Sequence, residues 1–238
     1  MSGPTDRMAT WIAGVRYGDI PTEVIARIKL LMLDSFGCAL FAADLPWSRL
    51  LRETLGAVDN STPGCAVWGT GERLSAPHAA LANGTMVQGF ELDDVHRQGV
   101  LHVGAVTLPP LLAVAGASAA LRLDADRTAH AIGMAATQSS GLMAAQYGAM
   151  VKRMHAGHAA RSGLLSALLA ARGFTGIRDV FEAPYGGFCT TFSRSEDRFD
   201  LAQLFEVDAE ILQSHAERLH QRHVGQGVGQ QPSDEEFE

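Results

Sequence analysis

The chain has 238 residues, of which 47% are hydrophobic, and a formal net charge of -7. An acidic chain without a basic stripe lacks the surface that nucleic-acid binding needs, so we expect no nucleic-acid partner. No window approaches the roughly 18 uninterrupted apolar residues of a membrane span, and the N-terminus has no secretion-signal pattern. The three cysteines, Cys38, Cys65 and Cys189, have no CxxC spacing. They favour a cytoplasmic protein without disulfides or a thiolate metal site.

The pattern along the chain predicts helices almost throughout. Expected helices cover 5–15, 22–39, 46–55, 75–90, 109–121, 127–138 and 154–172, with Thr5 or Asp6 capping the first. In 22–39 the apolar residues recur at three- and four-residue spacing, which predicts one face buried against a partner helix. Residues 65–68 form the one convincing strand-like fragment. Strands and helices do not alternate, so we predict an all-α fold.

The domain organisation follows from where this pattern changes. We expect residues 5–192 to form one helical domain. Residues 193–223 read as a polar segment that could form one more helix. Residues 224–238 have too few apolar side chains to order themselves, so a disordered tail is predicted there.

Three carboxylates and two imidazoles stand within twelve positions, and they form the first half of a candidate acid/base site. They are Glu91, Asp93, Asp94, His96 and His102, in a neighbourhood of Ala, Val and Leu. Clustered carboxylates repel one another, so one of them tends to hold a proton, and a histidine can move a proton near neutral pH. The alternatives are helix-end capping by the aspartates beside a solvated His102, or a metal site. No HExxH-like spacing supports the metal site.

A basic cluster at the start of an Ala-rich helix forms the second half. It contains Lys152, Arg153, His155 and His158. A lysine at a helix N-terminus suits carboxylates or phosphate, and the two histidines fall near one helical stripe that could line a pocket. The alternative is a solvated basic turn. No GxGxxG, P-loop or GxSxG motif occurs, so nucleotide binding and serine hydrolysis are not expected.

Several runs of sequence together resemble the MmgE/PrpD family. They are GFELDDVH at 89–96, LHVGAV at 101–106, GMAATQSSGL at 133–142, MVKRMHAG at 150–157 and RGFTG at 172–176, with DSFGCAL at 34–40 similar to the family's first long helix. The family includes 2-methylcitrate dehydratase, cis-aconitate decarboxylase and iminodisuccinate epimerase. The resemblance covers roughly residues 20 to 192.

The resemblance implies a fold and an activity. The fold is a large, usually dimeric helical domain joined to a smaller α+β lid, with the active site in the cleft between them. Such enzymes use no metal or organic cofactor and transfer a proton next to a carboxylate of a di- or tricarboxylate.

The resemblance also assigns roles to residues. His102 matches the acid/base histidine, Asp93 and Asp94 the acidic pair, and Lys152 the lysine that faces substrate carboxylates. The remaining expected substrate-binding residues are Glu91, Arg153 and His155.

Three departures from the family pattern leave a second hypothesis open. Relatives carry a further helical stretch, with another active-site histidine, where this chain runs directly through 111–123. Val95 stands where a hydroxyl residue is common, and the resemblance fades after Phe192, so we expect the lid to be absent. The leading hypothesis is a homodimeric hydro-lyase of the 2-methylcitrate dehydratase type. The competing one is a catalytically silent helical dimerisation module. Decarboxylase and epimerase activities stay open because they share the first proton transfer.

Overall fold

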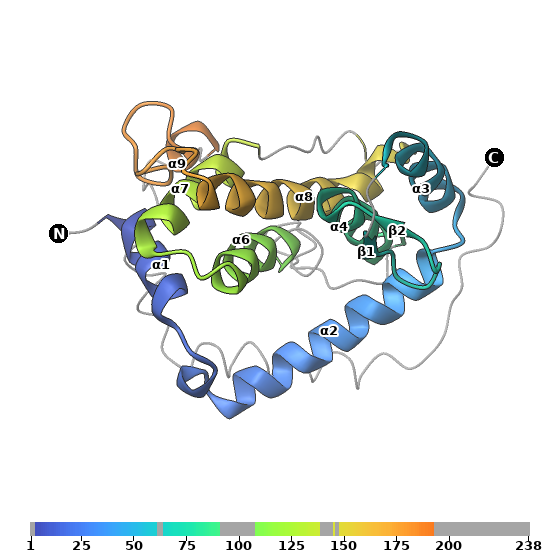
Figure 1. The fold of residues 1–238 in the computed structure, drawn as a ribbon, viewed down its shortest axis with the longest axis horizontal. Coiled ribbons are helices and arrows are strands. Elements are labelled where there is room, and N and C mark those ends of the chain that lie inside the picture. Colours follow the sequence, from blue (N-terminus) through green and yellow to red (C-terminus); the bar gives the residue numbers. More distant parts are fainter. Residues whose placement is uncertain (1–2, 61–63, 91–107, 139–144, 146–147, 193–238) are drawn as a thin grey trace. The chain divides into compact units, whose positions relative to one another are not determined.

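The computed structural model describes residues 3–60, 64–90, 108–138, 145 and 148–192, which all lie in one unit, Met1–Ser193. The helices are α1 (Pro4–Gly14), the 3-10 turn η1 (Tyr17–Asp19), α2 (Thr22–Ala42), α3 (Pro46–Val58), α4 (Ala76–Val87), α6 (Leu108–Ala120), α7 (Ala125–Ala136), α8 (Val151–Ala171) and α9 (Phe188–Phe192) (Figure 1). Strands β1 (Cys65–Ala66) and β2 (Arg73–Leu74) complete the described elements. The predicted all-α fold is confirmed. The segments expected at 193–223 and 224–238 lie outside the described residues.

The two short strands form an antiparallel hairpin where the sequence predicted a strand-like fragment. Cys65 pairs with Leu74, and Ala66 pairs with Arg73. Asn83 of α4 fastens the hairpin, because its side-chain amide donates to the Ala66 carbonyl at 3.1 Å and its oxygen accepts the Trp68 N–H at 3.0 Å. The hairpin therefore serves as a cover for α4 and adds no layer to the fold.

Two of the predicted helix starts are wrong, for different reasons. Helix α1 begins at Pro4, so Thr5 is no cap; it is buried, and its hydroxyl donates to Glu182 at 2.5 Å. A partner 177 positions away in the chain has replaced the local capping role. Helix α8 begins at Val151, three residues before the predicted start at 154. Lys152 therefore lies inside its first turn.

The described helices share two hydrophobic cores. The first core gathers side chains from α1, α6, α7 and α8, and the second gathers side chains from the end of α2, α3, the hairpin and α4. Helix α8 packs on α4, α6 and α7. The start of α8, which carries the basic cluster, is thereby held within the packed body of the protein.

The predicted burial of the apolar face of α2 is wrong. Of its side chains only those of Cys38, Ala39 and Ala42 are buried, while Ile28 and Met32 are exposed. The reason is that α2 makes its main contacts with α4, through its C-terminal turns.

Candidate functional site

The candidate site begins where α4 and α8 cross with their backbones in contact. A Cβ atom on Gly84 would lie 2.8 Å from the Gly157 Cα, and a Cβ atom on Gly157 would overlap the Leu81 carbonyl oxygen and the Thr85 hydroxyl. A side chain at either glycine therefore requires the helices to move apart. The crossing places the end of α4 beside the first turns of α8.

A buried amide fixes this arrangement. Gln88, at the C-terminal end of α4, is 2% exposed, and its side-chain oxygen accepts the backbone N–H of Ala156 at 3.3 Å. Ala156 follows Lys152 by four residues, which is about one helical turn. Burying an amide costs free energy unless it is hydrogen-bonded, so this contact gives the end of α4 a defined position against α8. Sequence analysis missed Gln88, whose signal is a single amide closing an Ala-rich helix.

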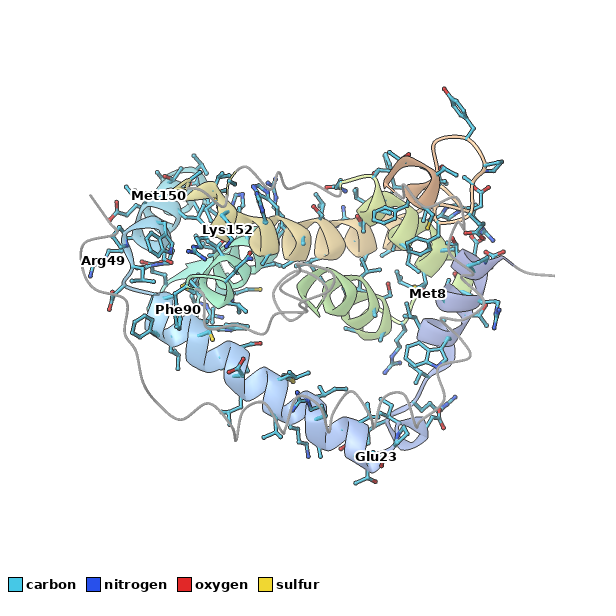
Figure 2. The ribbon with its side chains drawn as sticks, turned by 180° about the vertical axis from the view of Figure 1, so that it is seen from behind. Met8, Glu23, Arg49, Phe90, Met150 and Lys152 are labelled. Atoms are coloured by element: carbon cyan, nitrogen blue, oxygen red, sulfur yellow. The ribbon has the colours of Figure 1, made fainter. Side chains whose placement is uncertain are left out.

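Lys152, His155 and His158 form one flank of α8. All three are half-buried, and positions three apart lie on neighbouring parts of one helix face. Burial, followed by the positive charge of Lys152, lowers the pKa of His155. Burial, followed by Arg161 and then His155, lowers the pKa of His158. Both imidazoles therefore favour the neutral form at pH 7. Figure 2 labels Lys152 at the start of α8.

Arg153 faces the neighbouring helix α3. Its guanidinium lies 5.8 Å from the centre of the Trp47 ring, so it makes a cation–π contact with α3. The structure therefore brings Lys152 and His155 together and directs Arg153 toward a structural partner. The assignment of Arg153 to substrate binding stays a prediction.

The other half of the predicted site, Glu91, Asp93, Asp94 and His102, lies outside the described residues, and so does His96 of the metal alternative. The last described residue before it is well anchored. Phe90 packs on Phe41 of α2 with the ring centres 4.5 Å apart, two residues after the buried Gln88. In the part of the chain that the structure describes, no three His, Cys, Asp or Glu side chains are placed to share a metal ion. None of the helices described there is long and apolar enough to cross a bilayer.

The described residues form a helical domain. Lys152, His155 and His158 lie in the first turns of α8, which packs closely on α4 through Gly84 and Gly157. A sequence model of the MmgE/PrpD N-terminal domain matches residues 6–119 and 113–200. The chain belongs to the MmgE/PrpD family, as its motifs predicted.

Three similar proteins are all named after cis-aconitate decarboxylase. The chain is 34% identical over 254 residues to the cis-aconitate decarboxylase-like protein oryM of Aspergillus oryzae, covering 82% of this chain and 52% of that protein. It is 32% identical to a cis-aconitate decarboxylase of Aspergillus terreus, covering 83% of this chain and 51% of that one. For the human cis-aconitate decarboxylase the identity is 24%, with 79% and 51% covered. The chain thus spans about half the length of these relatives.

Proposed function

We propose that this protein is a lyase that acts on small di- and tricarboxylates by proton transfer at a carbon next to a carboxylate. The observation that carries the proposal is the flank of α8, where Lys152 and two histidines with lowered pKa values lie within the first turns of the helix. Relatedness to cis-aconitate decarboxylases supports the same substrate class. We therefore propose a small di- or tricarboxylate as the ligand.

Charge at the start of α8 suits a carboxylate ligand. Lys152 lies in the first turn of α8, at the positive end of the helix dipole, and both its charge and the dipole attract an anion. Neutral imidazoles at 155 and 158 can exchange hydrogen bonds with a second carboxylate without adding a fixed charge. Lys152 would hold one substrate carboxylate, and His155 would orient a second one.

The proton-transfer groups would come from the chain that follows α4. Asp93 and Asp94 follow Phe90 by only three and four residues in the sequence. Because Gln88 ties this end of α4 to the second turn of α8, a shared pocket is within reach. In the proposal His102 exchanges the proton with the substrate carbon, and Asp93 or Asp94 orients it.

Two reactions, decarboxylation and dehydration, could use a proton-transferring histidine beside groups that bind carboxylates. In decarboxylation the carbon–carboxylate bond breaks, its electron pair stays on the carbon, and His102 delivers a proton there as carbon dioxide leaves. In dehydration the proton is removed from the carbon and a carbon–oxygen bond breaks to release water. The names of the relatives favour decarboxylation of cis-aconitate, and dehydration of the 2-methylcitrate type is the second candidate.

An internal deletion, which we predict near 111–123, bears on how active the chain is. The alignment to the Aspergillus oryzae protein has 254 positions, yet 82% of 238 residues is about 195, so about 60 positions of that relative have no counterpart here. The two matches to the family domain meet at 113–119, and only 121–124 join α6 to α7. Arg122 in that connection has φ 54°, a value rarely found outside glycine. These observations support the deletion, and with it the silent helical module as the alternative function.

Turnover tests the proposal directly. The purified chain is incubated with cis-aconitate, 2-methylcitrate and citrate, and products are followed by NMR. We expect turnover that His102→Ala reduces at least about a hundredfold and a KM that Lys152→Met raises, with Arg172→Met at the far end of α8 as the control. Turnover that survives His102→Ala removes the assignment. Absence of both turnover and calorimetric binding for all three acids favours the silent module.

A further inference from the structure

Four basic or titratable side chains form a continuous row along α8. Lys152, His155, His158 and Arg161 follow one another at intervals of three residues, and all four are half-buried. Side chains three positions apart on a helix are neighbours. The members of the row act on one another, since Lys152 lowers the pKa of His155, and Arg161 and His155 lower the pKa of His158. A further positive charge in the row is therefore costly unless an anion comes to lie beside it.

The helices described next to α8 bring little negative charge to this row. Helix α8 has no Asp or Glu, and its other charged side chain, Arg153, contacts Trp47 of α3. Helix α6 has no charged or titratable side chain. Those of the remaining neighbours are His78 of α4, Arg49, Arg52 and Glu53 of α3, and Asp126, Arg127 and His130 of α7. Of the two acids among them, Asp126 pairs with Arg178 and Glu53 is exposed.

We infer that the protein takes up a proton from solvent when a carboxylate ligand binds at the start of α8, and that the imidazole of His155 receives it. This proton uptake rests on the proposed function, because it takes the ligand to be an anion held by Lys152. A carboxylate there offsets the lysine charge, brings a negative charge next to His155 and can accept a hydrogen bond from its ring. All three effects favour the imidazolium form.

His155 receives the proton rather than His158 because of their places in the row. His155 is the direct neighbour of Lys152, whereas His158 is one step further along and still has the positive charge of Arg161 beside it. A charged His155 also disfavours a second charge on His158. Because the complex binds more protons than the free protein, the affinity for the ligand rises as the pH falls. An average uptake of about 0.3 proton between pH 8 and pH 6 corresponds to about a fourfold gain in affinity.

Calorimetry of the full chain with fumarate tests the uptake. Fumarate is a dicarboxylate that is fully ionised at pH 7, so a proton taken up on binding must go to the protein. The binding enthalpy is measured at pH 7 in three buffers that differ in ionisation enthalpy, and the slope gives the number of protons per ligand. We expect at least about 0.3 proton for the wild type, a value near zero for His155→Gln and little change for His158→Gln, the matched control on the same row. Absence of fumarate binding, binding without uptake, or uptake that His155→Gln leaves unchanged would overturn the inference.

An NMR titration of the histidine rings in the wild type keeps the test independent of whether a variant folds. The measured pKa of His155 should be higher with saturating fumarate than without it, and an unchanged or lower pKa would contradict proton uptake at this residue. Turnover is a separate readout. A chain that takes up a proton with fumarate but does not convert cis-aconitate, 2-methylcitrate or citrate supports the uptake and contradicts the proposed reaction. Turnover without proton uptake does the reverse.

Discussion

Helices α2 and α8 are both 21 residues long, yet they bury themselves in different ways. Helix α8 packs against three other helices along its length, whereas α2 packs through its last turns. In both helices the buried residues are small, namely Cys38, Ala39 and Ala42 in α2 and Ala156, Gly157, Ala160, Gly163, Ser166, Ala167 and Ala170 in α8. Of the large apolar side chains of α2, Phe36 packs on Trp68 and Phe41 on Phe90, whereas Leu30 and Leu33 are exposed.

The comparison shows that close backbone approach, more than side-chain hydrophobicity, decides which helix faces pack within this protein. Where glycine and alanine line both helices, the axes come near enough for dense contact. A face of leucines needs a partner with matching holes, and the described part of the chain provides none for α2. The basic cluster consequently stands on the more firmly held of the two helices.

The largest expected effect comes from adding one methyl group where α4 and α8 cross. Gly157→Ala puts a Cβ against the Leu81 carbonyl and the Thr85 hydroxyl, so the helices must separate. We expect a loss of roughly 2–3 kcal/mol in the free energy of unfolding, measured by urea denaturation. Gly116→Ala is the control, because an added Cβ there meets no atom within 4 Å. A neutral Gly157→Ala would show that the crossing is looser than described.

A smaller loss is expected from removing the amide that joins the same two helices. Gln88→Leu deletes the acceptor for the Ala156 N–H while keeping similar volume, which should cost about 1–2 kcal/mol. If Gln88 also positions the site, the affinity for a tricarboxylate, measured by calorimetry, should fall more than it does in a Gln138→Leu control. Gln138 donates to Ser166 on another part of α8, at 3.4 Å. Equal loss of affinity in both variants would assign Gln88 a structural role only.

Sequence patterns predicted the helices well, because apolar spacing and proline positions act locally. Prolines open α1, α3 and α4, and Asp124 caps α7 by accepting the Arg127 N–H at 2.8 Å. Burial was harder to predict for α2, because its apolar spacing does not show whether the partner lies in the same chain. Thr5 was misassigned for a similar reason, since its partner Glu182 lies at the other end of the described chain.

The sequence predicted some residues of the candidate site better than others. Lys152 and His155 were predicted together, and three- or four-residue spacing on a helix is enough to place them on one flank. Gln88 could not be assigned, because its role depends on a helix 68 positions away. The convergence of His102 with Lys152 stays a prediction, since residue 102 lies outside the described residues.

A gain in stability is expected where the comparison predicts free space on α2. Gly37 is exposed, and an added Cβ meets no atom within 4 Å, so Gly37→Ala should stabilise the helix by about 0.5–1 kcal/mol. The measurement is urea denaturation of the full chain at low protein concentration. A loss of stability would indicate that another part of the same chain packs on this face of α2, and the contrast with α8 would fail.

The smallest expected effect is a change of stability with pH, which reports how strongly burial affects His155 on α8. Because burial and the Lys152 charge lower the pKa of His155, the folded protein binds this proton less tightly than the unfolded chain, whose histidines titrate near about 6.5. The unfolding free energy should therefore lose a contribution as the pH falls below about 6.5, and nothing should change above that range. His155→Gln should flatten this part of the stability–pH curve.

Lys152→Met separates the two causes of the shift. Burial is the larger cause, so this variant should keep most of the fall in stability below about pH 6.5. Added salt should reproduce the effect of Lys152→Met in the wild type, because salt screens the charge and leaves burial unchanged. If Lys152→Met removes the pH dependence completely, the charge dominates and the flank is wetter than its burial indicates. His155 would then face solvent, as the exposed side of α2 does, and α8 would hold a less enclosed carboxylate site than we propose.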